Sequence, residues 1–245
     1  MAGTPKFEQI ADDLRAKIES GEYGPGSPIP SDREIREAYG VASLTARKAL
    51  SELRSEGLIE IRRGANPVVS TWRPILRDAT TRLSAEQWGS GQAIWDADVA
   101  DRVMSVESLK VYETSDAPAW VAEALGTSEI LVRDRLFVVD KRPVQFAKSY
   151  LPLEIAKGTP IERHDTGPGG TFARLSDLGF APTRFQERSR SRKARPDEAR
   201  RLRMPSDRAV VVIRRKAATS EGRVVEVTEM TLDATAYILQ VSFTA

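Results

Sequence analysis

The hydrophobic pattern of the first 70 residues predicts three helices followed by a short β-hairpin. Apolar residues recur at helical spacing in three runs, and each run gives one helix an apolar face. From Leu58 to Arg63 apolar and polar residues alternate, which is the period of a strand, and after a break at residues 64–67 Val68 and Val69 continue it. The helical runs are Phe7, Ile10, Leu14 and Ile18, then Ile35, Ala38 and Tyr39, then Ala46, Ala49, Leu50 and Leu53.

Capping residues mark both ends of the second helix. Ser31 is followed three residues later by Glu34, the spacing at which each side chain binds a backbone N–H of the first turn. Gly40 is the residue type that most readily takes the left-handed conformation that ends a helix. A tight turn through Val41 and Ala42 then leads to the third helix. This order predicts a helix-turn-helix.

The outward face of the third helix carries polar and basic side chains, which a helix needs in order to bind base edges and phosphates in a DNA major groove. Amphipathic helices with polar outer faces also occur in proteins that bind no DNA, so the helix pair alone leaves both interpretations open. Arg62 and Arg63 near the tip of the following hairpin favour DNA binding, because they form a basic wing. The outward residues of the helix are Ser43, Thr45, Arg47, Lys48 and Ser51.

From about residue 98 the hydrophobic period changes to two, and the pattern predicts strands with short helices between them. The turn at residues 140–143 separates two apolar runs and predicts a hairpin. Helices are expected at Thr171–Leu178 and from Pro196 onward. This order indicates an α+β domain around a mainly antiparallel sheet. Further strands are expected at residues 185–192, 209–217, 224–232 and 237–243.

These patterns divide the 245 residues into two domains joined by a linker. We expect a DNA-binding domain at residues 1–70, a linker at 71–97 and a second domain at 98–245. The linker contains three tryptophans and is too apolar for a freely solvated segment. Part of it is therefore expected to pack on the second domain, and a plain linker is the alternative.

Composition limits the classes of function. The chain is 40% hydrophobic and 29% charged, has no apolar run of the roughly 18 residues that span a bilayer, and lacks the apolar core of a signal peptide. We therefore expect a cytoplasmic protein with no membrane partner. Zero cysteines exclude disulfides and cysteine nucleophiles, and one histidine, His164, cannot form the usual zinc sites. No catalytic residue, metal site or cofactor is expected.

Residues 6–69 resemble the GntR family of bacterial transcription regulators, through KFEQIADDLRAKIESG, PGSPIPSDREI, AYGV, TARKAL and ELRSEGLIEIRRG. The resemblance implies a winged helix-turn-helix in which the positions matching Arg33, Thr45, Arg47 and Gly64 contact DNA. Together with the outward and basic residues, the expected DNA-binding set is Arg33, Ser43, Thr45, Arg47, Lys48, Arg62, Arg63 and Gly64.

Two departures from the family pattern concern residues that read DNA. The usual Val-Ser-Arg at the start of the recognition helix is Val41-Ala42-Ser43 in this chain. The usual wing tip, Gly-Arg-Gly-Thr, is Gly64-Ala65-Asn66-Pro67. The operator sequence is therefore not carried over from the family, whereas the expectation of DNA binding stands.

The segment from about Leu109 to Phe243 resembles the UTRA effector-binding domain of the HutC subgroup, whose fold is similar to chorismate lyase. The resemblance lies in LVRDRLF, RPVQFAKSYLP, GGTFARL and GRVVEV. It implies a sequence-specific transcription regulator, a repressor released by a small anionic or hydroxylated metabolite. The expected partners are double-stranded operator DNA, bound by a homodimer at a palindromic site, and the small-molecule effector.

Arg133 and Arg135 are candidate effector-binding residues, because residues two apart on a strand project from one face and two guanidinium groups can hold a phosphate or carboxylate. Relatives that bind phosphosugars use arginines at the matching positions. A pair of solvated arginines is the alternative. Where many relatives carry a ligand-facing glutamate this chain has Ala147, so a phosphosugar is not carried over as the effector.

Thr171 follows a glycine-rich turn at residues 167–170 and opens a predicted helix, whose N–H groups attract anions. In relatives a hydroxyl residue matching Thr171 contacts ligand. A simple turn would use the same glycines. Ser149 and Glu226 complete the expected effector-binding set.

A different interpretation of the second domain is a small-molecule-binding or lyase-like enzyme domain fused to a DNA-binding module. It follows from the lyase fold of its apparent relative, although a shared fold is poor evidence for shared chemistry. The basic run at residues 184–203 is likewise open to two interpretations. It forms either a second nucleic-acid surface or a charged strand edge that discourages aggregation.

Overall fold

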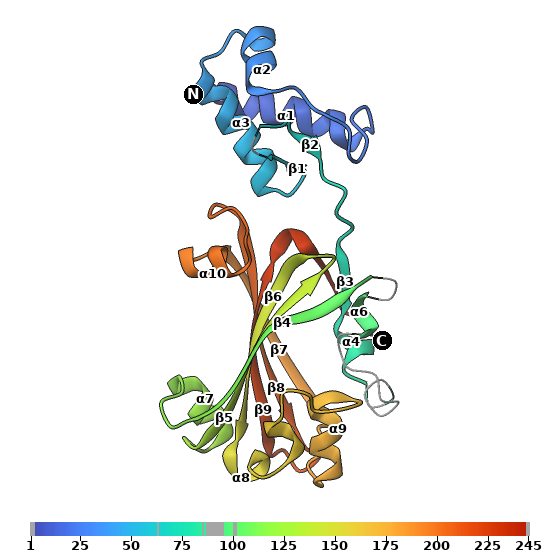
Figure 1. Ribbon diagram of the computed structural model, residues 1–245, viewed down its shortest axis with the longest axis vertical. Helices are drawn as coiled ribbons and strands as arrows, with labels where there is room; N and C mark the ends of the chain where they lie inside the picture. Colours follow the sequence, from blue (N-terminus) through green and yellow to red (C-terminus); the bar gives the residue numbers. More distant parts are fainter. Residues whose placement is uncertain (1–2, 63, 85, 87–95, 100–101, 244–245) are drawn as a thin grey trace. The chain divides into compact units, whose positions relative to one another are not determined.

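The chain folds into two compact units, Met1–Arg73 and Pro74–Ala245. Each unit builds its own hydrophobic core from buried side chains. The ribbon in Figure 1 follows the chain from the helices of the first unit to the sheet of the second. The structure, a computed structural model, describes residues 3–62, 64–84, 86, 96–99 and 102–243.

The first unit is a winged helix-turn-helix, as the sequence pattern predicts. The apolar faces of its helices meet in one core, in which Ile10, Ile35 and Leu53 are fully buried. Ala38, expected on the apolar face, is exposed. The two strands of the hairpin are short, with two residues each. The elements are α1 (Lys6–Glu19), α2 (Asp32–Tyr39), α3 (Ser43–Ser55), β1 (Ile59–Glu60) and β2 (Val68–Val69).

Both predicted ends of α2 are confirmed. The N–H of Ser31 donates to Glu34 Oε2 at 2.8 Å, and the N–H of Glu34 donates to Ser31 Oγ at 3.4 Å. Gly40 ends the helix in the left-handed conformation, with a φ of 63°. These caps fix where α2 stops and therefore where the turn places the start of α3.

The second unit is built on a six-stranded antiparallel sheet with the order β4-β5-β6-β9-β8-β7. The predicted hairpin between β5 and β6 is confirmed, and its turn is narrower than expected. Only Asp140 and Lys141 form it, with φ values of 47° and 66° that suit a two-residue hairpin turn. The strands are β4 (Met104–Thr114), β5 (Ile130–Val139), β6 (Arg142–Pro152), β7 (Arg184–Lys193), β8 (Ala209–Ala218) and β9 (Val224–Asp233).

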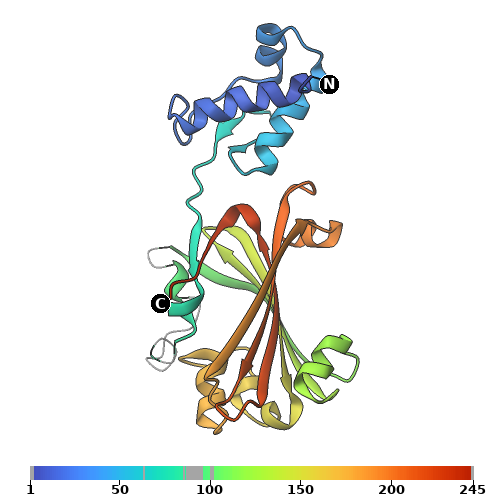
Figure 2. The ribbon, with the colours of Figure 1, turned by 180° about the vertical axis from the view of Figure 1, so that it is seen from behind.

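Helices cover both faces of this sheet (Figures 1 and 2). On one face α8, η1 and α9 pack against Leu131 and Leu151. On the other face α7 packs against Val132, and α10 packs against Val212. The bounds are α7 (Ala119–Leu125), α8 (Leu153–Ala156), η1 (Pro160–Glu162), α9 (Gly170–Asp177) and α10 (Pro196–Arg201).

The segment expected as a linker at residues 71–97 folds in part with the second unit. Its strand β3 (Ile75–Asp78) pairs in parallel with β10 (Tyr237–Gln240), so the strand expected at 237–243 is shorter and lies outside the antiparallel sheet. Two short helices follow β3, and η2 precedes β10. They are α4 (Ala79–Arg82), α6 (Asp96–Val99) and η2 (Ala234–Ala236).

A buried ion pair holds β3 against the main sheet. Arg77 is 2% exposed, and its Nη1 and Nη2 donate to the two carboxylate oxygens of Glu187 on β7, at 2.9 and 2.5 Å. This bidentate geometry gives the pair directional strength that a point charge lacks.

Within the described part of the chain, no helix is both long enough and apolar enough to cross a bilayer.

Candidate nucleic-acid interface and effector site

The outward face of α3 is open to solvent. The side chain of Arg47 is 74% exposed, and Lys48 is exposed as well. Ser43 and Thr45 are half-buried and lie outside the core. The exposed side chains of Arg47 and Lys48 make this face accessible to a partner. The opposite face of α3 is buried and consists of Ala46, Ala49, Leu50 and Leu53.

Asp32, in the first turn of α2, organises this face. Ser43 Oγ donates to its carboxylate at 3.3 Å, and Arg47 Nε lies 3.8 Å from Asp32 Oδ1. The pair with Arg47 is exposed and long, so it orients the guanidinium without contributing much stability. Asp32 is not among the DNA-binding residues expected from the sequence. The sequence feature that could have identified Asp32 is an acidic residue directly after the capping serine, on the helix that packs beside α3.

Two further predicted residues differ in how firmly they are held. Lys48 Nζ lies 3.6 Å from the centroid of the Phe7 ring, a cation–π contact that fixes Lys48 against α1. Arg33 is 75% exposed, and its Nε lies 3.8 Å from Glu37. Arg33 is therefore the more mobile of the two cations.

The wing supplies a second exposed basic segment. The side chain of Arg62 is 78% exposed, and its Nη2 donates to Glu60 at 3.2 Å. Gly64 has a φ of 77°, a conformation that favours glycine. Arg63 lies outside the described residues. A groove of about 440 Å³ separates the wing from α3 and is lined in part by Arg47, Arg54 and Asn66.

The second unit contains a cavity of about 810 Å³ between β4, β5 and the loop that leads into α9. Arg133, Arg135 and Thr171 line it, so the fold brings together three of the five predicted effector-binding residues. Ser149 and Glu226 are buried on β6 and β9 and do not line it. Ser149 accepts a hydrogen bond from Arg135, and Glu226 forms an ion pair with Arg215.

Arg133 is held by the backbone of the loop that closes the cavity. Its Nη1 donates to the carbonyl oxygens of Ile161 at 2.5 Å and Arg163 at 2.6 Å, and its Nη2 donates to that of His164 at 3.0 Å. Arg133 is 2% exposed, so the alternative of a solvated arginine is wrong for this residue, and its part in effector binding stays a prediction. Burial lowers the pKa of Arg133 to about 10, helped by the like charge of Arg135.

Arg135 has fewer partners. Its Nη2 donates to Ser149 Oγ at 2.7 Å, and that hydroxyl lies 3.0 Å from Thr228 Oγ1. Its Nε has no hydrogen-bond partner among the described residues. Burial lowers the pKa of Arg135, and the negative charge of Glu226 only partly opposes this effect. Glu226 is itself shared with Arg215, whose Nη2 lies 3.4 Å from its carboxylate.

This arrangement favours an anion. Arg133 and Arg215 are buried and Arg135 is half-buried, and the buried carboxylate of Glu226 opposes the charge of all three. An uncompensated buried cation is costly, and a carboxylate or phosphate in the cavity would offset that cost. Gly169 and Gly170 adopt left-handed conformations at the start of α9, with φ values of 76° and 66°, and no side chain caps that helix. The N–H of Gly170 donates to the carbonyl of Gly167 at 3.1 Å, so any N–H group that α9 offers to an anion begins at Thr171.

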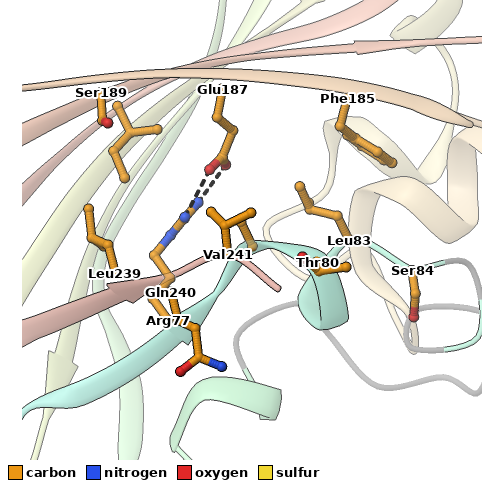
Figure 3. Close-up of a pocket in the computed structure, with 12 residues that line it drawn as sticks. Arg77, Thr80, Leu83, Ser84, Phe185, Glu187, Ser189, Leu239, Gln240 and Val241 are labelled. Atoms are coloured by element: carbon orange, nitrogen blue, oxygen red, sulfur yellow. Dashed lines mark hydrogen bonds and ion pairs between the residues drawn. The ribbon is translucent and has the colours of Figure 1, made fainter. Parts of the chain in front are cut away.

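A second hollow, of about 520 Å³, lies beside β3 (Figure 3). Leu83, Phe185 and Leu239 line it, and the Arg77–Glu187 ion pair crosses it. None of the five predicted effector-binding residues lines this hollow. The first cavity therefore remains the candidate effector site.

Comparison with family models identifies both halves of the chain. Residues 6–69 match the model of the bacterial regulatory proteins of the gntR family, and residues 100–238 match the model of the UTRA domain. An uncharacterised HTH-type transcriptional regulator of Streptomyces coelicolor is 32% identical over 91% of this chain and 86% of its own length. The HTH-type transcriptional repressor NagR of Bacillus subtilis is 30% identical over 62% of this chain and 60% of its own length.

Solved structures share the fold of the whole chain. The crystal structure of a GntR-family transcriptional regulator has a TM-score of 0.62 at 23% identity, covering 99% of this chain and 98% of that one. PhnF from Mycobacterium smegmatis has a TM-score of 0.55 at 20% identity, covering 96% and 99%. At these identities the likeness concerns the fold alone.

Proposed function

Because this chain belongs to the GntR family of bacterial transcription regulators and carries a UTRA domain, we propose that its α3 face and wing bind operator DNA while the cavity of its second unit binds the effector. The observation that carries the DNA part is the exposure of Arg47 on a helix whose opposite face is buried. The proposed contacts at the base edges come from α3, and those at phosphates from Arg33 and Arg62.

The proposed effector is a small anionic or hydroxylated metabolite that releases a repressor from DNA in the cytoplasm. The two arginines, Arg133 and Arg135, and the hydroxyl of Thr171 at the cavity support this chemistry. Relatives named as repressors, NagR and the mannosyl-D-glycerate system repressor MngR of Escherichia coli, support the direction of regulation. Arg135 is the proposed anion-binding residue, and Arg133 the residue that positions the loop.

The proposed assembly is a homodimer, in which two copies of α3 meet successive major grooves of a palindromic site. The β3–β10 ribbon supports a second copy as partner, because Leu76 and Ile238 are cross-strand neighbours and are 49% and 54% exposed. Val241 and Phe243, which follow β10, are 68% and 85% exposed. A contiguous exposed apolar surface commonly marks a protein interface.

The competing function is an enzyme domain attached to a DNA-binding module. It is not favoured, since the relatives that match most of the chain are transcription regulators. The two functions give different results when a bound metabolite is followed over time. A regulator binds and releases the metabolite unchanged, and the affinity of the regulator for DNA changes. An enzyme converts the metabolite to product.

A selection from random duplexes tests the proposed function. The full chain is incubated with a library of double-stranded DNA, and the bound fraction is recovered and sequenced through several rounds. We expect enrichment of a two-fold symmetric sequence whose half-sites are spaced by about one helical turn or somewhat more. Recovery of unrelated sequences after the same number of rounds would contradict sequence-specific binding.

A thermal-shift screen of anionic and hydroxylated metabolites tests the effector part. A ligand that binds only the folded chain raises its apparent melting temperature with concentration. We expect a hit to lose its effect in Arg135→Gln, and to release the selected duplex from the wild-type chain. A hit that stabilises both variants equally would place the effector elsewhere.

A further inference from the structure

One large apolar side chain stands on the exposed face of α3. Leu44 is 80% exposed in the first turn of the helix, whereas Leu50 and Leu53 are buried. A single exposed leucine is ordinary on a protein surface and needs no explanation by itself. Leu44 differs from an ordinary surface leucine because it lies at the beginning of the helix proposed to bind DNA.

Helical spacing puts Leu44 beside the basic residues of the same face. Arg47 and Lys48 follow it by three and four residues, and Ser51 follows it by seven, so the four side chains form one stripe. The other three side chains carry groups that can donate hydrogen bonds, whereas Leu44 offers only hydrocarbon. The first turn therefore carries one apolar side chain on a surface that is otherwise polar.

The major groove has one apolar group for such a side chain. Of the four bases only thymine carries a methyl group there, at C5, while the other features of the groove are hydrogen-bond donors and acceptors. The first residues of a recognition helix are those that reach base edges. An apolar residue at this place gains by covering the methyl group and loses by covering a polar base edge.

We propose that Leu44 reads the C5 methyl group of one thymine in each half-site of the operator. This inference rests on the DNA-binding function proposed above and adds a residue that determines sequence preference. Leu44 contributes a hydrophobic contact with a defined base, whereas Arg47 and Lys48 contribute charge. The contact does not depend on salt, because it releases no counterion.

Replacing thymine by 2′-deoxyuridine in the selected duplex removes the methyl group and keeps every hydrogen-bonding atom. Each thymine is replaced in turn, symmetrically in both half-sites, and the affinity of the full chain is measured. We expect one position at which the wild-type chain loses about fourfold per half-site, the value for one buried methyl group. At that position Leu44→Ala binds the thymine and uracil duplexes with equal affinity.

Two variants serve as controls. Leu44→Met keeps an apolar side chain of similar size and retains the preference for thymine. Arg47→Ala binds both duplexes more weakly and keeps their ratio, because it removes a polar contact. Leu44→Ala folds normally, since the side chain is 80% exposed and alanine favours helix, and an unchanged melting temperature verifies this.

The proposal is overturned if no thymine shows the methyl dependence in the wild-type chain, or if Leu44→Ala keeps the wild-type ratio at every position. It is also overturned if Leu44→Ala weakens binding to all duplexes by one factor, which would indicate a contact with the sugar-phosphate backbone. Failure to select any duplex would instead count against DNA binding itself, so the two failures are distinguishable.

Discussion

Arg133 and Arg135 are two residues apart on one face of β5, yet the fold gives them different partners. Arg133 donates to three carbonyl oxygens of the loop at residues 161–164, while Arg135 donates to the hydroxyl of Ser149. The strand period predicts that both guanidinium groups share a face. It cannot predict the carbonyl partners, because these lie about 30 residues further along the chain in a loop without regular periodicity.

The different partners predict different effects of the same substitution. Arg133→Met leaves the buried carbonyl of Ile161 and the partly buried carbonyls of Arg163 and His164 without this donor, and we expect it to lower the free energy of unfolding by about 1–3 kcal/mol. Arg135→Met removes one hydrogen bond and an unfavourable buried charge, so we expect a change smaller than about 1 kcal/mol and loss of effector binding. Urea denaturation of the full chain measures both values. The reverse ranking of the two variants would contradict the division of roles.

Single residues also set the geometry of the DNA-facing surface. Ser31→Ala removes the side-chain acceptor of the Glu34 N–H at the start of α2, and we expect it to lower the free energy of unfolding by about 1 kcal/mol. Ser55→Ala is the matched control, because Ser55 Oγ donates to the carbonyl of Glu52 at the far end of α3 and caps no helix start. Equal losses in the two variants would contradict the importance of the cap.

Among the elements, β3 is the first strand of the second unit. It follows Arg73, the last residue of the first unit, pairs with β10 and is held to β7 by the Arg77–Glu187 ion pair. Burial raises the pKa of Glu187, but the hydrogen bond and charge of Arg77, with the charges of Arg215 and Arg82, outweigh burial and lower it. The folded chain therefore prefers Glu187 ionised.

This lowered pKa predicts how stability depends on pH. Since the pKa of Glu187 in the folded chain lies below its ordinary 4.5, ionised Glu187 stabilises the fold above that pH, and the contribution is lost as the pH falls through the folded pKa. Glu187→Gln should therefore lower stability at neutral pH and flatten the loss on acidification. The measurement is urea denaturation at a series of pH values. An identical acid dependence in the variant and the wild-type chain would contradict the assignment.

Elements with strong local signals were predictable, and those made by distant partners were not. The α2 caps, the helix-turn-helix and the β5–β6 hairpin each depend on neighbouring residues, and all are confirmed. The parallel pairing of β3 with β10 joins segments about 160 residues apart, so neither segment shows it alone. The same limit applies to Asp32, which matters because α3 packs beside α2.

For the molecule as a whole, release of the operator by the effector requires that binding to one unit changes the affinity of the other. If the effector weakens operator binding by some factor, the operator must weaken effector binding by the same factor. We expect the dissociation constant of a metabolite found by thermal shift to rise when the selected duplex is present. Calorimetric titration with and without duplex measures it. Equal constants would remove the allosteric part and leave the two binding sites independent.

DNA binding by the α3 face is tested by the affinity of Arg47→Ala for the selected duplex. We expect a loss of about 1–3 kcal/mol, roughly fivefold to a hundredfold, and a smaller dependence on salt, with no change in melting temperature. Lys216→Ala is the control, because it removes one exposed positive charge from β8 in the second unit. Its affinity should match that of the wild-type chain. Wild-type affinity in Arg47→Ala, or equal losses in the two variants, would contradict DNA binding by the α3 face.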